Sequence, residues 1–370
     1  MTHPLFARFH HLNKKGKAPE ENFSSGWQSP SNIALVKYWG KKDGQLPLNP
    51  SLSMTLKSAV TQTRVHASTD EDIKGLISVN SDEHHAFLPK MQQLLKLLTM
   101  EMPFLGTLSL RAETLNSFPH STGIASSASG MSAFALCLLD IACYMLHEEI
   151  SFAEWQQMAS CASRLGSGSA CRSVYGGYAM WGKSILMLGS SDDFAIPVNA
   201  YVHPDMMSLR DAILIVSTKP KKVPSSQGHQ SMKVHPYLTG RITQANQNLA
   251  DVLHALASDD FEQLAAVAEN EALSLHGLLM SASPGTILIQ PGTLQIIHHV
   301  REARKKGLPL LFTLDAGANV HILYPAVAAK EVEEFIHDIL CPFCEDGTVI
   351  YDECGSGPVR LSENQEKSAG

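Results

Sequence analysis

The chain has 370 residues, of which 44% are hydrophobic and 18% charged, and its formal net charge is -7. These values are ordinary for a soluble globular protein and allow either two domains or one large composite domain. The negative charge argues against a general binder of nucleic acid or of acidic membranes, because such proteins need a basic surface. If the ligand is an anion, the positive charge that binds it must be local.

The first residues of the chain show no features of an exported protein. Residues 1–28 are polar and mixed in charge, and they lack the apolar stretch of a signal peptide. We expect a flexible extension there. Seven cysteines with no secretory signal favour a reducing compartment, so we expect a cytoplasmic protein.

Two short strands are predicted next, over Asn32–Val36 and Ser51–Leu56. The connection between them carries three lysines and a tyrosine, which are Lys37, Tyr38, Lys41 and Lys42. Lysines are common where a strand edge faces solvent, which is one interpretation. The other is a cationic wall with a hydroxyl group that binds a phosphorylated ligand, and the segment by itself favours neither.

A run of small and hydroxyl residues, Asn116–Gly130, separates a predicted strand from a predicted helix. The strand is Thr107–Leu115, where apolar and polar residues alternate, and the helix is the largely apolar Met131–Leu146. This helix is short of a full membrane span and carries Asp140, so we expect a core helix. Backbone N–H groups at a helix start bind phosphate, although a helix cap is the more common reason for such a run. The run does not match the pattern of P-loop enzymes.

A second helix, Ser151–Leu165, begins with a capping box in which Ser151 is followed three residues later by Glu154. The segment after it, Ser167–Ser173, places Arg172 among small hydroxyl residues. A guanidinium group in such surroundings grips carboxylate or phosphate, and the alternative is a helix cap followed by a solvated turn. A strand interrupted by glycines is expected over residues 175–182.

A change of composition near residues 199–209 predicts a domain boundary, and a buried strand follows over Ala212–Val216. The lysine-rich segment Thr218–His229 is either a solvated loop or a mobile lid over a nucleotide. Three helices are predicted after it, over residues 236–257, 261–280 and 291–306.

A buried strand over Leu308–Leu314 ends at Asp315, and Asn319–Tyr324 is predicted to pair with it. An aspartate at the end of a buried strand either caps the turn or acts in catalysis. A helix over residues 328–340 and a strand over residues 348–351 complete an alternation typical of α+β layers. The CxxC pair Cys341 and Cys344 follows a helix, unlike a thioredoxin motif, and we interpret it as a pair of free cysteines.

Four stretches of the chain, taken together, resemble the diphosphomevalonate decarboxylase family of the GHMP-kinase superfamily. They are NIALVKYWGKK at 32–42, FPHSTGIASSASG at 118–130, RLGSGSACRSVYGG at 164–177 and FTLDAGANVHILYP at 312–325. The resemblance runs from about residue 31 to residue 358. The second stretch marks only the superfamily, whereas KYWGK and SGSACRS are specific to the family.

The resemblance implies an α+β, two-domain GHMP-kinase fold with an active-site cleft between the domains. Residues 29–205 would form an N-terminal, ribosomal-protein-S5-like domain that binds ATP. Residues 206–370 would form a C-terminal domain of ferredoxin-like α/β layers. The family also implies Mg²⁺ beside ATP, a small-molecule substrate and a homodimer, with no nucleic acid or membrane as partner.

The implied reaction is the phosphorylation by ATP of the C3 hydroxyl of mevalonate 5-diphosphate, followed by loss of phosphate and CO₂. The products are isopentenyl diphosphate, ADP and phosphate, as in isoprenoid biosynthesis. Related alternatives are a kinase for a mevalonate-type alcohol, a decarboxylase of the 5-monophosphate, and a non-catalytic binding protein on the same scaffold.

The resemblance also implies roles for individual residues. Asp315 would meet the C3 hydroxyl as general base or positioning group, and Arg172 would hold the substrate carboxylate. The substrate-binding residues would be Asn32, Tyr38, Lys41, Ser167, Ser169 and Arg172. The ATP-binding residues would be Ser121, Gly123, Ser126, Ser127, Lys221, Lys222, Ser225 and Ser226, with Ser127 as a ligand of Mg²⁺.

Overall fold

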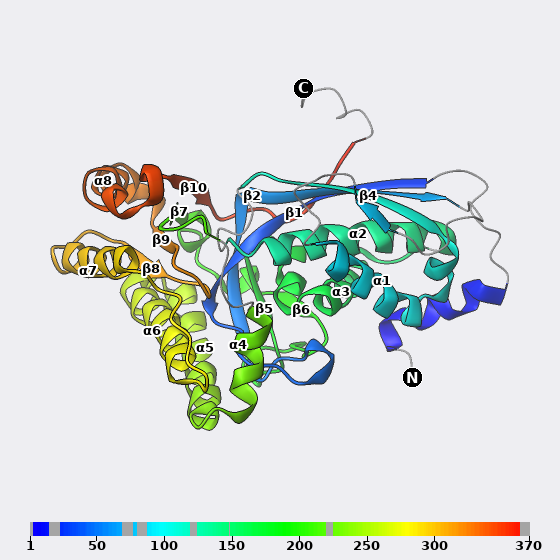
Figure 1. Cartoon of the computed structure of the whole chain (residues 1–370), viewed down its shortest axis with the longest axis horizontal. Helices are drawn as coiled ribbons and strands as arrows, with labels where there is room; N and C mark the ends of the chain where they lie inside the picture. Colours follow the sequence, from blue (N-terminus) through cyan, green and yellow to red (C-terminus); the bar gives the residue numbers. More distant parts are fainter. Residues whose placement is uncertain are drawn as a thin grey trace.

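The computed structural model describes residues 3–14, 23–68, 77–79, 87–118, 124–147, 149–219 and 225–362. Two β-sheets form its framework, and each has helices packed against it (Figure 1). The larger sheet is built mainly from the first half of the chain and the smaller sheet from the second half.

The larger sheet has the strand order β11-β1-β2-β4-β3, and β5 pairs with both β2 and β6. Every pairing is antiparallel except that of β3 with β4. Its strands are β1 (Phe23–Val36), β2 (Ser51–Ser68), β3 (Ile77–Val79), β4 (Ser109–Asn116), β5 (Tyr178–Trp181), β6 (Ala195–Pro197) and β11 (Val359–Arg360). The predicted strand over residues 32–36 is therefore the end of the much longer β1.

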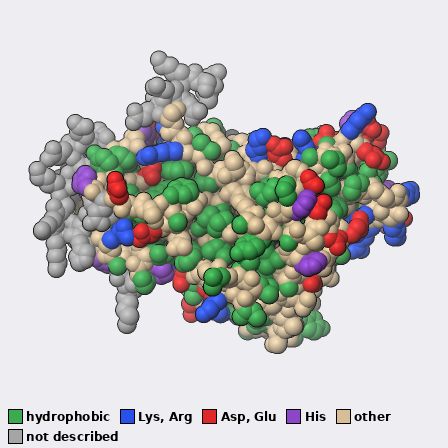
Figure 2. Space-filling view, turned by 180° about the vertical axis from the view of Figure 1, so that it is seen from behind, with side chains coloured by type: hydrophobic (Ala, Val, Ile, Leu, Met, Phe, Trp, Pro, Cys, Tyr) green, Lys and Arg blue, Asp and Glu red, His purple; other side chains and the backbone are tan. Residues whose placement is uncertain are grey.

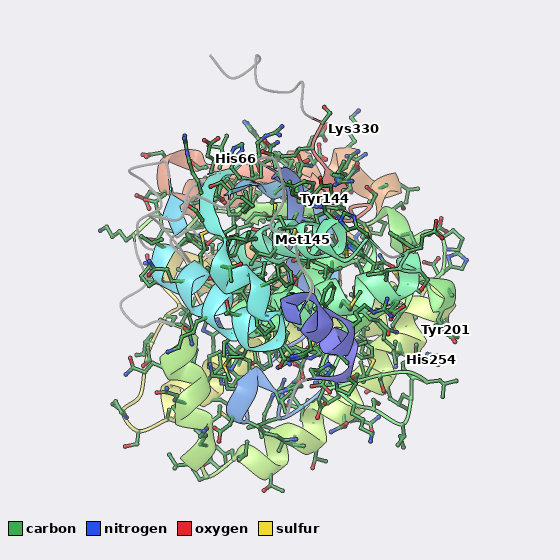
Figure 3. All side chains as sticks on the ribbon, turned by 90° about the vertical axis from the view of Figure 1, so that its right-hand side faces the viewer. His66, Tyr144, Met145, Tyr201, His254 and Lys330 are labelled. Carbon is green, nitrogen blue, oxygen red and sulfur yellow. The ribbon has the colours of Figure 1, made fainter. Side chains whose placement is uncertain are left out.

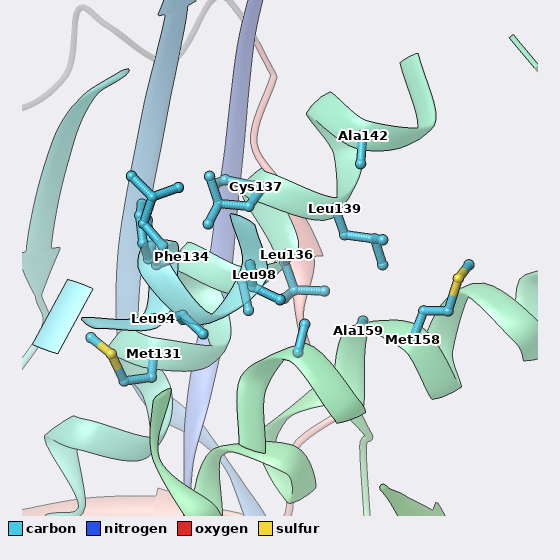
Figure 4. Packing of buried hydrophobic residues seen from close by; sticks show 14 of the residues in the cluster. Leu94, Leu98, Met131, Phe134, Leu136, Cys137, Leu139, Ala142, Met158 and Ala159 are labelled. Atoms are coloured by element: carbon cyan, nitrogen blue, oxygen red, sulfur yellow. The ribbon is translucent and has the colours of Figure 1, made fainter. Parts of the chain in front are cut away.

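Three helices cover one face of this sheet: α1 (Leu88–Glu101), α2 (Ser126–Leu146) and α3 (Phe152–Gly166). The helix α2 is central, and Phe134 and Leu136 are fully buried against Leu94 and Met158 of its neighbours (Figure 4). By length and composition Ser126–Met145 could cross a membrane, but 78% of its most apolar window is buried inside the protein. The expected core helix is confirmed. The predicted capping box also forms, because the N–H of Glu154 donates to the Ser151 hydroxyl.

Parts of the predicted flexible extension are packed against this domain. A 3₁₀ helix, Pro4–Lys14, buries Phe6 and Phe9 completely in the core of the larger sheet. Strand β1 already begins at Phe23, whose ring stacks on Tyr144 at the end of α2 (Figure 3). The expectation of a flexible segment is wrong for these two parts, because side chains three residues apart align on one face of a 3₁₀ helix and both are aromatic.

The smaller sheet has the strand order β10-β7-β9-β8, and all its pairings are antiparallel. Its strands are β7 (Arg210–Leu214), β8 (Leu311–Thr313), β9 (Val320–Tyr324) and β10 (Val349–Glu353). The helices of this half are α4 (Ser225–Ser231), α5 (Leu238–Ser258), α6 (Phe261–Ser281), α7 (Pro291–Lys305) and α8 (Ala329–Phe335). The helix predicted to reach residue 340 changes at Ile336 into one turn of π-helix, Ile336–Leu340.

Both faces of the smaller sheet are buried, which explains its nearly continuous apolar strands. Leu214 and Tyr324 pack toward α7 and α8, whereas Ile213 and Leu323 face α5, α6 and the first domain. Leu52 of β2 belongs to this second cluster, so the two halves share one apolar core.

The C-terminal end returns to the first half of the molecule. Strand β11 pairs with β1, with Arg360 opposite Trp27, although residues 206–370 are predicted as one C-terminal domain. Residues of β1 and of β11 contact the buried Asp140 of α2. Its carboxylate accepts hydrogen bonds from Ser25 and Trp27 of β1, and it forms an ion pair with Arg360 of β11 at 3.0 Å. The predicted pair of free cysteines is confirmed at Cys341 and Cys344.

Candidate active site

Asp315 and Lys37 meet where the two halves of the molecule join. Lys37 directly follows β1 and Asp315 follows β8, and the Lys37 Nζ lies 3.1 Å from the Asp315 Oδ1. The side chain of Lys37 is 1% exposed, whereas that of Asp315 is 28% exposed. The carboxylate is therefore the member of the pair that a ligand can reach.

The charge of Lys37 depends on its neighbours. Burial lowers the pKa of Lys37, while the carboxylates of Asp315 and Glu271 act in the opposite direction. The guanidinium group of Arg172 lowers this pKa further. Sequence patterns place Lys37 only among the lysines of a cationic wall, because burial and ion pairing with a residue 278 positions away leave no local signal.

Two contacts hold the main chain near Asp315. The Thr313 hydroxyl of β8 donates to the Ala34 carbonyl of β1 at 3.4 Å, which ties the two sheets together. His276 of α6 is buried, and its Nε2 lies 3.1 Å from the Asp315 carbonyl oxygen. The chain around Asp315 is thus held from the sheet side and from the helix side.

Arg172 lies in a 3₁₀ segment, Gly168–Val174, and is buried, and the side-chain oxygen atoms that accept its hydrogen bonds are neutral. Its guanidinium group donates to Ser53 at 2.9 Å, to Ser51 at 2.6 Å and to Asn32 at 3.3 Å. It forms no ion pair with any residue that the structure describes. Burial lowers the pKa of Arg172, and Asp315 is near enough for its charge to oppose that effect. A guanidinium group held in this way is a prepared site for an anion.

Asn32 supports Arg172 rather than pointing away from it. Its Oδ1 accepts from Arg172, and its Nδ2 donates to the Ser173 hydroxyl at 2.8 Å and to the Ser169 carbonyl at 3.3 Å. These contacts engage both polar ends of the amide. Direct contact between Asn32 and a substrate stays a prediction.

The turn that carries Ser167 and Ser169 lies against Tyr38. A Cβ atom on Gly168 would stand 2.8 Å from the Tyr38 ring and 2.9 Å from Trp181, so only glycine allows this approach. Both serines are partly exposed. The Tyr38 hydroxyl is buried and has no hydrogen-bond partner among the residues that the structure describes, and burial raises the pKa of this phenol. Four of the predicted substrate-binding residues, which are Asn32, Tyr38, Ser167 and Ser169, are thereby brought around Arg172.

A histidine packs against the aromatic rings of Tyr38 and Trp39, and together these three side chains form an aromatic wall. The ring of His229, in α4, lies 4.3 Å from that of Tyr38 and 4.7 Å from that of Trp39, measured between centroids. The Gly40 N–H donates to its Nδ1 at 3.0 Å, so a neutral His229 carries its proton on Nε2. Burial, aided by the charge of Lys41, lowers the pKa of His229 to about 3. Sequence reasoning covers His229 only as the end of a lysine-rich segment and misses this position.

Lys41 lies near His229, close enough for its charge to act on that ring. Its Nζ donates to the Gln45 Oε1 at 2.9 Å, and burial followed by the nearby charge of Lys233 lowers the pKa of Lys41. The turn Asp43–Gln45 also holds Lys233, whose Nζ lies 3.2 Å from Asp43. The ammonium groups of Lys41 and Lys233 thus both contact side chains of this turn.

The predicted phosphate loop ends at the first residues of α2. Ser126 and Ser127 begin this helix after Ala125, which has a φ of 42°. Lys90 of α1 donates to the Ser127 hydroxyl at 2.8 Å, and burial lowers the pKa of this lysine. Sequence reasoning misses Lys90, because it lies on an ordinary amphipathic helix. Ser121, Gly123, Lys221 and Lys222 lie outside the described residues, as do the side chains of Ser225 and Ser226.

The role of Ser127 as a ligand of Mg²⁺ stays a prediction, because residues 119–123 of the same loop lie outside the described residues. The hydroxyl predicted to hold Mg²⁺ already accepts from the Lys90 ammonium group. Magnesium prefers carboxylate and phosphate oxygens. Within the described ranges, the one cluster of three metal-ligating side chains is His203, Asp205 and Asp259, which is exposed and belongs to another part of the fold.

Charged side chains of both signs are interspersed over the face of the molecule seen in Figure 2. Ion pairs between exposed or partly exposed side chains of the molecule include Lys305 with Glu302 and Lys57 with Glu353.

Comparisons with known proteins place these observations in a family. The model of the diphosphomevalonate decarboxylase-like N-terminal domain matches residues 29–193, and that of the mevalonate 5-diphosphate decarboxylase C-terminal domain matches residues 212–369. A diphosphomevalonate decarboxylase of Aspergillus fumigatus is 31% identical over 86% of this chain and 80% of its own length. The human diphosphomevalonate decarboxylase is 28% identical over 80% of this chain and 75% of its own length.

Solved structures agree with the sequence relatives. A mevalonate diphosphate decarboxylase from Enterococcus faecalis superposes with a TM-score of 0.75 at 28% identity, covering 92% of this chain and all of that one. The enzyme from Staphylococcus aureus gives a TM-score of 0.77 at 27% identity over 94% of this chain and all of its own. The predicted two-domain GHMP-kinase fold is confirmed, and the chain belongs to the diphosphomevalonate decarboxylase family.

Proposed function

We propose that this chain catalyses the ATP-dependent decarboxylation of mevalonate 5-diphosphate to isopentenyl diphosphate, with release of ADP, phosphate and CO₂. The observation that carries the proposal is the meeting of Asp315, Lys37 and Arg172 from three distant parts of the chain. The reaction needs an exposed carboxylate for an alcohol and a cation for a carboxylate, and this site offers both. A relative of this fold has been solved in complex with MVAPP, AMPPCP and magnesium, at 29% identity and a TM-score of 0.76.

In the first stage, Asp315 orients the C3 hydroxyl and accepts its proton while the oxygen attacks the γ-phosphate of ATP. A tertiary alcohol is a poor nucleophile, so alignment and a base within hydrogen-bond reach are both needed. The ammonium group of Lys37, 3.1 Å from the carboxylate, keeps Asp315 ionised before the transfer. Because Asp315 is 28% exposed, it can return the proton to water afterwards.

In the second stage, the C–O bond to the new phosphate breaks and positive charge grows at C3. An ionised Asp315 stabilises that charge. Arg172 holds the substrate carboxylate in place until the bond to CO₂ breaks. Its hydrogen bonds to Ser51 and Ser53 orient the guanidinium group, so that alignment requires little rearrangement of the protein.

The remaining residues bind phosphate groups. Tyr38, Lys41, Ser167 and Ser169 form the wall for the diphosphate of the substrate. Ser126 and Ser127, with Lys90, meet the phosphates of ATP at the start of α2. Magnesium, which enters with ATP, supplies further neutralisation of the phosphate charge. Ser121, Gly123, Lys221, Lys222, Ser225 and Ser226 are proposed for the same ATP site.

The test is a paired measurement of ADP and CO₂ from carboxyl-labelled mevalonate 5-diphosphate with Mg-ATP, repeated with the 5-monophosphate. Equal yields of ADP and CO₂ from the diphosphate alone support the proposal. ADP without CO₂ identifies a kinase, and turnover of the monophosphate alone identifies a different decarboxylase. No reaction with either refutes the enzymatic assignment.

We further propose that the protein works as a homodimer in the cytoplasm. Family membership supports the dimer, and the free state of all seven cysteines is compatible with a reducing compartment. Light scattering tests the dimer, because two chains have twice the 40.3 kDa mass of one. A monomer at micromolar concentration would refute it.

A further inference from the structure

A buried ion pair, formed by Glu271 and Arg241, contacts the main chain of Lys37. Glu271 of α6 and Arg241 of α5 are almost completely buried, and the guanidinium group donates to both carboxylate oxygens, at 2.6 Å and 2.7 Å. Asn248 of α5 donates to the Glu271 Oε1 at 2.6 Å. The carboxylate is therefore fixed from two positions on the neighbouring helix.

The same pair holds the main chain of Lys37. The Lys37 N–H donates to the Glu271 Oε2 at 2.8 Å, and Arg241 donates to the Lys37 carbonyl at 3.0 Å. Strand β1 ends at Val36, so these two polar groups lie beyond the strand and need other partners. Asn49 also donates to the Lys37 carbonyl, at 3.0 Å. Each end of the ion pair thus binds one main-chain group of the residue that contacts Asp315.

We infer that Glu271 and Arg241 are positioning residues, which hold Lys37 through its main chain so that its ammonium group meets Asp315. The inference rests on the proposed function, since it assigns Lys37 and Asp315 to the reaction. Both residues come from the helices of the second half, whereas Lys37 directly follows a strand of the first half. Lys37 is therefore held across the junction of the two halves at two places. Its main chain is bound by Glu271 and Arg241, and its ammonium group is bound by Asp315.

If Glu271 and Arg241 had only a structural role, replacing them would change the stability of the protein but not kcat or its pH dependence. Removing one partner of a buried ion pair destabilises a protein, because the other charge stays buried without compensation. Another such pair lies on the same helix, where Glu269 is buried and binds Arg301 and Arg304 of α7. This second pair joins two helices and does not bind Lys37. It is a matched control for the cost of disturbing a buried charge on α6.

The charge of Glu271 also acts on the ammonium group. The charged groups placed around Lys37 by the structure are Asp315, Glu271 and Arg241, together with Arg172 on the 3₁₀ segment and Asp211 on β7. His276 lies next to this group through the Asp315 carbonyl. Replacing Glu271 by glutamine preserves shape and a hydrogen-bond acceptor, but leaves Arg241 and Arg172 without this opposing charge. The pKa of Lys37 then falls, and its ammonium form is lost at lower pH.

The experiment compares Glu271→Gln and Arg241→Lys with the control Glu269→Gln and with the wild type. CO₂ release from mevalonate 5-diphosphate is measured as a function of pH, and thermal unfolding is followed for each variant. We expect Glu271→Gln to lower kcat at least about tenfold and to move the basic limb of the kcat profile to lower pH. Arg241→Lys keeps the charge but loses the bidentate contact, so kcat falls while the basic limb stays in place. The control retains the wild-type profile.

The outcomes separate this inference from the proposed function. An inactive wild type refutes the proposed function before any variant is compared. With an active wild type, folded variants whose kcat and pH profile match those of Glu269→Gln overturn the positioning role. If Glu271→Gln does not fold, kcat of Arg241→Lys decides, and a value within twofold of the control overturns the inference.

Discussion

The pair formed by Asp315 and Lys37 predicts a combined effect of one substitution on turnover and on stability. Asp315→Asn is nearly isosteric, so it changes the charge at the site without creating a cavity. Removal of the catalytic base is expected to lower kcat by about 10³-fold or more, because general base catalysis contributes about 10²–10⁴-fold and the variant also loses charge stabilisation at C3. ATP binding is expected to stay nearly unchanged, since the site proposed for the ATP phosphates is the start of α2.

The stability effect follows from the buried ammonium group. In the variant, Lys37 retains Glu271 as a carboxylate neighbour and gains a neutral amide acceptor in place of the Asp315 carboxylate. The free energy of unfolding at pH 7 is therefore expected to fall by about 1–2 kcal/mol, which is at the lower end of the contribution of a hydrogen bond to a charged group. The pKa of Lys37 is already below its unfolded value of 10.5, and the substitution lowers it further. The folded state then binds fewer protons than the unfolded state between these two pKa values, so stability rises with pH across that window.

The assay is urea unfolding of wild type and Asp315→Asn from pH 6 to pH 10, together with CO₂ release and nucleotide binding. The variant is expected to gain more stability than the wild type as the pH rises toward 10. A variant as stable as the wild type at every pH would show that Asp315 does not compensate the charge of Lys37. Near-normal turnover would refute the role of Asp315 in the reaction.

Three further substitutions test the site and the fold. Arg172→Lys cannot reach Ser51 and Ser53 together and should lower kcat/KM for the substrate about 100-fold, whereas a loss below fivefold in steady-state assays would contradict the carboxylate role. Lys90→Met should raise the KM for ATP about tenfold and leave the KM for mevalonate 5-diphosphate unchanged, and equal effects on both would argue against an ATP contact. Phe6→Ala should cost about 3 kcal/mol in urea unfolding, because the side chain is fully buried, and a cost below 1 kcal/mol would mean that the N-terminal helix adds little to the core.

Local patterns in the sequence predict most of the secondary structure. The alternation over residues 107–115 became β4, and the capped pattern beginning at Ser151 became α3. Helices α5, α6 and α7 begin and end within about two residues of the predicted bounds. These elements are predictable because periodic burial, end caps and helix length act between residues close in the chain. The segment Pro4–Lys14 was missed, since one short 3₁₀ helix offers too few turns for a periodic pattern.

By itself the sequence determined the α+β class, the order of most of the elements, the family, and Asp315 and Arg172 as candidates, whereas α1 and β3 have no counterpart among the predicted elements. Only the tertiary structure decided that Lys37 is buried against Asp315, and that Glu271 and Arg241 enclose its main chain. On their own helices these last two residues resemble ordinary charged side chains, which usually face solvent. Their burial results from the joining of two sheets and two helices far apart in the chain, and a contact of that kind leaves no periodic or spaced signal in a single sequence.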